Sequence, residues 1–169
     1  DEGDKRDMYE LNIEPRPEFV FAYPGFNFRG TEIGAFLGVT QIDKLDGHIE
    51  IRNRNFKLFL ELLDSNKFIT NYDLEGSSNF GLIIILKDAD DILMGSIISK
   101  LVDEEVHFRR GIAGGGNQLR QPYLRGKNYG NAEDFPNADH IHYYGLYIGN
   151  HQYITEENIK DICEVLNNV

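Results

Sequence analysis

An arginine- and glycine-rich stretch lies in the middle of an otherwise acidic chain. Residues 108–123 read FRRGIAGGGNQLRQPY, and no Asp or Glu occurs between positions 106 and 132. The same interval holds the basic residues Arg109, Arg110, Arg120, Arg125 and Lys127. Guanidinium groups bind phosphate oxygens in a forked geometry, so this basic island indicates an anion site. The alternative is a loop-rich surface whose acidic residues lie elsewhere.

The glycine run does not match the standard phosphate-binding loops. In a G-x-G-x-x-G reading, Leu119 occupies the place of the last glycine. In a P-loop reading, Asn117 and Gln118 stand where Lys and Ser or Thr are required. Both loops need those residues to approach or hold the phosphates, so we expect neither a dinucleotide site nor a nucleotide triphosphate site of these types.

Histidines and the single cysteine are the other residues that could do chemistry. His140 and His142 form a His-x-His pair, which on a strand would place both rings on one face, and His151 follows. With one cysteine and no second histidine pair, we predict ordinary histidines and no metal site. Cys163 falls on the apolar stripe of an expected helix, which indicates core packing rather than nucleophilic catalysis.

Composition narrows the class of protein and its partners. The chain has 169 residues, a net charge of −11 and 41% hydrophobic residues, which is typical of a globular domain. The acidic excess argues against nucleic-acid binding. We expect no membrane span, because no apolar run reaches 18 residues. The polar N-terminus does not resemble a signal peptide, and one cysteine fits a reducing compartment, so we predict a cytoplasmic protein.

The elements that must position these residues are strands mixed with covering helices. Helices are predicted over 31–41 with Thr31 as cap, over 46–65, after a cap at Asp88, and after a cap at Thr155. Strands are predicted at 67–72, 80–87, 106–110 and 146–148, with a long loop-rich segment at 111–145. This pattern predicts a two-layer α/β or α+β domain over 31–169, preceded by an extended, proline-containing segment and interface loop at 1–30.

Several short segments together resemble one family. GFNFR at 25–29, TEI at 31–33 and QIDKL at 41–45 resemble the G-Y-N-x-R to Q-L-x-K-L block of the DegT/DnrJ/StrS-type sugar aminotransferases. EVHFRR at 105–110 is similar to a strand of that family. GNQLRQPY at 116–123 and LYIGNHQ at 146–152 are similar to its nucleotide-sugar 3-dehydratase branch, such as the GDP-4-keto-6-deoxymannose 3-dehydratases. The resemblance covers about residues 18–169.

The resemblance implies a fold and a cofactor. The chain would be the C-terminal small domain of a fold-type-I transferase that depends on pyridoxal phosphate (PLP), with a mixed or antiparallel sheet covered by helices and a long interdomain helix. The large PLP-binding domain would lie before residue 1. It would carry the Schiff-base lysine, or the histidine that replaces it in the dehydratases. We therefore expect the chain alone to be inactive.

The resemblance also assigns site residues. Asn27 would reach across a dimer interface to the cofactor phosphate, although an asparagine there is also a common turn residue. Arg29 would lie near the same anion. One of Arg109 and Arg110 would bind the nucleotide diphosphate while the other faces away, because strand neighbours alternate faces. His151, in the G-N-H signature, would contact sugar or cofactor.

The complete enzyme would act on nucleotide-linked 4-keto-6-deoxy sugars. It would either transfer an amino group from glutamate or dehydrate the sugar at C3, and the G-N-H signature favours dehydration. A homodimer is implied, and Gly34 and Gly38 mark one place where another backbone could approach. The alternatives are a non-catalytic module that binds a nucleotide sugar or a protein, and a folded fragment without activity.

Overall fold

The computed structural model describes residues 30–111, 116–124 and 126–169. The main elements are α2 (Glu32–Ile42), α3 (Leu45–Leu62), β1 (Gly81–Ile85), α4 (Asp91–Asp103), β2 (Phe108–Arg110), α5 (Pro136–Tyr144), β3 (Gly145–Gly149) and α6 (Glu156–Asn167). Three short 3-10 turns, at Gln118–Arg120, Pro122–Leu124 and Ala132–Asp134, precede α5. The predicted α/β class and the long helix are confirmed.

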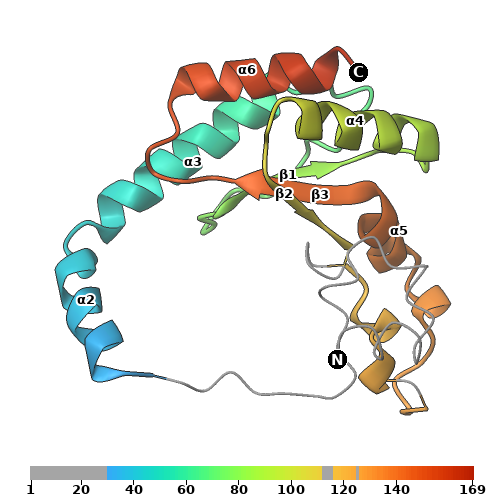
Figure 1. Ribbon diagram of the computed structural model, residues 1–169, viewed down its shortest axis with the longest axis horizontal. Coiled ribbons are helices and arrows are strands. Elements are labelled where there is room, and N and C mark those ends of the chain that lie inside the picture. The colour runs from blue at the N-terminus through green and yellow to red at the C-terminus, as the bar shows by residue number, and fades with distance from the viewer. Residues whose placement is uncertain (1–29, 112–115, 125) are drawn as a thin grey trace.

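The sheet is antiparallel, with strand order β1-β3-β2. Ile148 of the central strand lies opposite Leu82 of β1 and Phe108 of β2. Helices α3, α4 and α6 cover one face of this sheet (Figure 1). This arrangement confirms the predicted two-layer organisation, and it settles the sheet as antiparallel within the described ranges.

The hydrophobic core lies between the sheet and these three helices. Alternate strand residues point into it, including Leu82, Ile84, Leu146 and Ile148. Helix α6 contributes the stripe that the sequence predicts, namely Ile159, Ile162, Cys163 and Leu166. Each fully buried aliphatic side chain stabilises the fold by roughly 1.5–3 kcal/mol relative to exposure, so this stripe fixes α6 on the sheet.

Three predicted boundaries need correction. The cap of α4 is Asp90 rather than Asp88, since its side chain accepts a hydrogen bond from the backbone N–H of Leu93 at 2.8 Å. Helix α3 ends at Leu62 rather than at residue 65. The strand predicted at 67–72 is a single bridge between Phe68 and Leu86, because the chain leaves the sheet edge after that point.

Helix α5 was missed by the sequence analysis, which predicted a loop-rich segment there. Its apolar spacing is weak, since its nine residues, PNADHIHYY, include two histidines and an aspartate. Pro136 at the first helical position was the available signal, because proline is favoured at that position. His140 and His142 are therefore on a helix and not on a strand.

Helix α2 begins where the sequence predicts but does not pack as its spacing suggests. The hydroxyl of Thr31 accepts a hydrogen bond from the Gly34 N–H at 3.1 Å, as a cap should. The helix buries none of its residues, and the Phe36 side chain is 72% exposed. A Cβ added at Gly38 would meet nothing within 4 Å. In Figure 1, α2 stands apart from the sheet and its covering helices.

Candidate functional site

Strand β2 places Arg109 and Arg110 on opposite faces of the sheet. Arg110 lies opposite Leu146, a core residue, and its Nη2 donates a hydrogen bond to the carbonyl of Tyr143 in α5. Arg109 lies opposite Tyr147 and is exposed. Directly opposed residues of antiparallel strands share a face. The guanidinium on the side away from α3, α4 and α6 is therefore that of Arg109.

That side of the sheet, called here the open face, carries Ile83, Tyr147 and Arg109 and holds a hollow of about 480 Å³. Its lining is mostly apolar, and the rings of Phe80 and Tyr147 meet edge to face with centroids 5.4 Å apart. An aromatic and aliphatic shelf can hold the flat or apolar part of a ligand, while a neighbouring guanidinium binds an anionic part.

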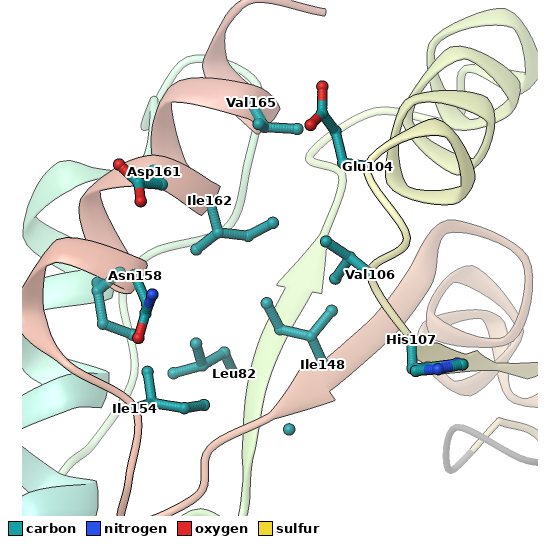
Figure 2. A pocket seen from close by; sticks show the side chains of 12 residues that line it. Leu82, Glu104, Val106, His107, Ile148, Ile154, Asn158, Asp161, Ile162 and Val165 are labelled. Carbon is teal, nitrogen blue, oxygen red and sulfur yellow. The ribbon is translucent and has the colours of Figure 1, made fainter.

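A second hollow lies between α6 and the strands on the helix side of the sheet (Figure 2). Its volume is about 410 Å³, and Leu82, Ile148 and Ile162 are among the apolar residues that line it. The carboxylates of Glu104 and Asp161 also line it. Like charges repel, so this hollow is a poor site for a phosphate, and the open face is the better candidate.

Arg120, the third arginine of the basic island, is held inside the fold. Its Nε donates to Oδ1 of Asp139 at 2.8 Å, and its Nη2 donates to Oδ2 of the same carboxylate. Its guanidinium also lies over the Tyr143 ring, 4.9 Å from the centroid. The Arg120 hydrogen bond holds the pKa of the Asp139 carboxyl below its usual value. The basic island is therefore not a set of ligand-facing cations.

The GNQLRQPY segment at 116–123 also has a structural role. Asn117 is buried, and its Nδ2 donates to the Ala132 carbonyl at 3.0 Å and to Oδ1 of Asp139 at 2.9 Å. Its own Oδ1 accepts from the Leu119 N–H at 3.1 Å. The asparagine therefore ties the segment after the glycines to the start of α5, a role that the sequence analysis did not foresee.

In the G-N-H signature, the asparagine is buried and hydrogen-bonded within the fold, whereas the histidine is exposed. Asn150 is 2% exposed, and its Nδ2 donates to the carbonyls of Arg52 at 3.0 Å and Asn79 at 2.9 Å. Its backbone N–H donates to the Phe80 carbonyl at 2.7 Å. Asn150 thereby joins α3, the start of β1 and the end of β3. Sequence reasoning singled out its neighbour, His151, and missed it.

His151 is exposed in the loop after β3, with its ring 5.0 Å from that of Tyr153. It follows Tyr147, the residue opposite Arg109, by four positions and lies beyond the end of β3 at Gly149. Two further predicted site residues, Asn27 and Arg29, lie outside the described residues.

The cysteine and His140 lie in environments that indicate packing and hydrogen bonding within the fold rather than catalysis. Burial raises the pKa of the Cys163 thiol to about 12, so the thiol stays protonated, in agreement with a core position. Nε2 of His140 lies 2.6 Å from the Leu86 carbonyl. Within 30–111, 116–124 and 126–169, no three His, Cys, Asp or Glu side chains gather closely enough to hold a metal ion. None of the helices described there has both the length and the apolar character that crossing a bilayer requires.

Fold and site together define a class: a small α/β domain whose antiparallel sheet is covered by helices on one face and presents an arginine beside an apolar shelf on the other. Residues 4–167 match the DegT/DnrJ/EryC1/StrS aminotransferase family. The chain belongs to this family.

Sequence relatives and solved structures agree with that assignment. A GDP-4-keto-6-deoxy-D-mannose 3-dehydratase of Yersinia pseudotuberculosis is 32% identical over 160 residues, which are 93% of this chain and 40% of the relative. A solved GDP-4-keto-6-deoxymannose-3-dehydratase with a trapped PLP-glutamate geminal diamine superposes with a TM-score of 0.66 at 26% identity. A mutant of such an enzyme with bound GDP-perosamine gives the same TM-score and identity.

The match is partial from the relatives' side. Each of the two solved structures is covered over 39% of its chain, against 89% of this one. The chain thus spans about two fifths of the length of the relatives it matches.

Proposed function

We propose that this chain is the C-terminal domain of a PLP- or pyridoxamine-phosphate-dependent enzyme that acts on nucleotide-linked 4-keto-6-deoxy sugars. The observation that carries the proposal is the 32% identity to a GDP-4-keto-6-deoxy-D-mannose 3-dehydratase over 93% of the chain. The shared fold, at 26% identity, supports it. Between the two reactions of the family, we favour dehydration at C3 over amino transfer, for which glutamate would be the amino donor.

We propose that this chain holds only part of the site for PLP. When bound, PLP supplies an electron sink for carbanion chemistry and is held by protein groups that orient it. Nζ of Lys67 donates to the carbonyls of Asn167 and Val169, and Lys100 forms an exposed ion pair with Glu104 one turn away, so neither lysine faces the open face. We place the anchoring residue in the remainder of the enzyme, and we propose Asn27 and Arg29 as contributors to the phosphate site.

Within this chain, we assign substrate binding to the open face. Arg109 is exposed there beside Tyr147, and the apolar hollow next to it is large enough for a ring of the nucleotide sugar. Arg110 is assigned a structural role, because it donates to the Tyr143 carbonyl. We keep His151 as a contact to the sugar of a ligand that extends beyond the open face, since its ring is exposed.

The test of substrate binding is titration of the chain with GDP and with a GDP-linked sugar, followed by isothermal calorimetry. Replacing Arg109 by Gln is expected to weaken binding by about tenfold or more, corresponding to about 1.4 kcal/mol. Lys160→Gln, at an exposed position of α6, removes the same charge elsewhere and serves as the matched control. Equal affinities for Arg109→Gln and the unaltered chain would remove Arg109 from the site.

The test of the enzymatic proposal is reconstitution. The chain alone is expected to show no absorbance band from bound PLP and no turnover of a GDP-4-keto-6-deoxy sugar. When it is joined to the N-terminal three fifths of the Yersinia relative, cofactor binding and sugar conversion should appear, and mass spectrometry of the product distinguishes loss of water from gain of an amino group. Tight nucleotide-sugar binding without PLP, and no conversion after joining, would favour a non-catalytic binding module.

A further inference from the structure

The turn at 150–154, which joins β3 to α6, carries two exposed aromatic rings and is held by two buried amides. His151 is exposed, and the ring of Tyr153, which is 80% exposed, lies 5.0 Å from that of His151. By contrast, Asn150 is 2% exposed and Asn55 of α3 is fully buried. Because a buried amide needs hydrogen-bond partners to offset its loss of water, those partners show what it holds.

The two amides fix both ends of this turn. Nδ2 of Asn55 donates to the carbonyl of Ile154, the last residue of the turn, at 3.1 Å and to Oδ1 of Asn150, the first residue, at 3.5 Å. Asn150 is itself fixed by its hydrogen bonds to the Arg52 and Asn79 carbonyls. One side chain of α3 therefore links the first and the last residue of the turn.

A hydrogen bond inside the turn fixes the backbone of His151 relative to these ends. The Ile154 N–H donates to the His151 carbonyl at 3.0 Å. Both backbone groups of Ile154 are thus used, the carbonyl by Asn55 and the N–H by His151. A turn with its backbone groups bonded in this way has few alternative conformations, so the His151 side chain extends from an ordered backbone.

Helix α6 does not need Asn55 in order to begin. Thr155 and Asn158 each accept a hydrogen bond from the other's backbone N–H at its first turn, and its apolar stripe packs on the core. A buried amide at position 55 therefore contributes something that capping and packing do not. Fully bonded polar networks inside a protein specify one arrangement of the elements that they join, which here is the placement of the turn on α3.

We propose that Asn55 is a positioning residue, which holds the turn at 150–154 on α3 so that His151 is presented to the sugar of a bound nucleotide sugar. This role rests on the function proposed above, in which His151 contacts that sugar. Asn55 itself is buried and acts through the turn. It keeps the turn ordered before binding, which removes the cost of ordering it when the sugar binds.

Hydrogen exchange of the chain without ligand tests the positioning. Asn55→Ala should speed exchange of the Ile154 N–H by about tenfold or more, because the turn loses the bond to its last carbonyl. Asn167→Ala is the matched control, since the Asn167 amide also joins α6 to the end of α3: it accepts from the Asp64 N–H at 2.8 Å and donates to the Leu62 carbonyl at 2.9 Å. This control should change exchange at Ile154 by less than about twofold.

Titration with GDP and with GDP-mannose tests the consequence for the sugar. The ratio of the Kd for GDP to the Kd for GDP-mannose isolates the contribution of the sugar, because both ligands carry the same nucleotide. Asn55→Ala should reduce this ratio by about three- to tenfold and His151→Ala by a similar factor, whereas Asn167→Ala should leave it within about twofold. Since Asn55 acts through His151, adding Asn55→Ala to His151→Ala should produce no further loss.

The outcomes separate the role of Asn55 from the proposed function. A ratio that falls with His151→Ala but not with Asn55→Ala would overturn the role of Asn55 and leave the sugar contact standing. Equal losses with Asn55→Ala and Asn167→Ala would also overturn it, since a general loss of stability would then explain both. No binding of GDP-mannose, or a ratio that His151→Ala leaves unchanged, would refute the sugar contact and the role of Asn55 with it. If Asn55→Ala does not fold, Asn55→Ser, which keeps a donor on a shorter side chain, is judged by the same exchange and titration.

Discussion

At the residue scale, three arginines of one short segment have three environments. Arg109 is exposed on the open face, Arg110 donates to a carbonyl of α5, and Arg120 is paired with Asp139 at 15% side-chain exposure. Burial, rather than residue type, decides which of these side chains is exposed to a ligand. The basic island in the sequence therefore overstated the number of arginines that can bind an anion.

Asp139→Asn is expected to lower the free energy of unfolding at pH 7 by about 1–3 kcal/mol, because it removes the carboxylate that is hydrogen-bonded to the Arg120 guanidinium and leaves only the exposed Glu133 nearby. The folded-state pKa of Asp139 is depressed, mainly by the Arg120 hydrogen bond. The stabilisation is thus present above the unfolded-state pKa near about 4 and is lost as pH falls through the folded-state pKa. Urea unfolding at several pH values should show the difference between wild type and variant shrinking in acid.

The control for that prediction is Glu133→Gln. Its carboxylate lies 3.7 Å from Nη2 of Arg120 and its side chain is 73% exposed. Exposed pairs contribute little, so a change below about 0.5 kcal/mol is expected. A larger loss from Glu133→Gln than from Asp139→Asn would contradict the assignment of the partner.

Asn150→Ala is expected to lower the free energy of unfolding by about 2–3 kcal/mol, because the Arg52 and Asn79 carbonyls lose a shared buried donor. His151→Ala, at the exposed neighbouring position, should cost less than about 0.5 kcal/mol. Thermal unfolding of both variants makes the comparison. Similar losses at the two positions would show that the signature stabilises the fold through more than its asparagine.

At the element scale, local signals determined where most helices begin. Thr155 caps α6 with a reciprocal pair, in which its hydroxyl accepts from the Asn158 N–H at 3.2 Å and Asn158 accepts from the Thr155 N–H at 3.1 Å. The apolar stripe then holds the helix on the sheet. Cap and stripe agree, so α6 could be predicted from sequence with its buried residues.

Thr155→Ala is expected to cost about 1 kcal/mol in the free energy of unfolding, since the first turn of α6 loses its side-chain acceptor. Thr155→Ser retains the hydroxyl, so its free energy of unfolding should differ from that of the wild type by no more than about 0.3 kcal/mol. Urea denaturation measures the free energy of unfolding of both variants, provided that its dependence on urea concentration has the same slope as in the wild type. An equal loss for the serine variant would mean that the methyl group, rather than the cap, carries the effect.

At the scale of the whole molecule, α2 is the element that the described fold leaves uncovered. Its apolar side chains lie around the helix rather than along one stripe, and Ile33, Phe36 and Val39 are among the exposed ones. A helix that is apolar all round is normally buried. We therefore propose that α2 takes part in the homodimer interface expected for this family.

Phe36→Glu is expected to shift the chain toward monomer, because it places a charge in that apolar surface. Light scattering coupled to size exclusion at several protein concentrations measures the mass. Glu61→Lys, on the exposed side of α3, changes charge elsewhere and should leave the mass unaltered. Identical masses for Phe36→Glu and wild type at every concentration would exclude α2 from the interface.

Much of the fold followed from the sequence because its signals are local. The run Gly81–Ile85 predicts a buried strand, and the spacing of Met94, Ile97 and Leu101 predicts one face of α4. Helix α5 was not predicted because its polar residues obscure the helical spacing of its apolar ones. The strand predicted at 67–72 was wrong because only Phe68 forms a bridge to the sheet. The family resemblance could also be read from short motifs, and the family is confirmed over 4–167.

The candidate site depended on contacts between residues distant in sequence. The sequence by itself determined the α/β class, the capped helices and the family, because caps, periodicity and motifs lie within a few residues of one another. Only the tertiary structure decided three relations. Arg120 forms an ion pair with Asp139, the buried Asn150 side chain hydrogen-bonds the Arg52 carbonyl, and Arg109 shares a face of the sheet with Tyr147. Strand register and long-range burial set those relations, and neither is written in any single segment.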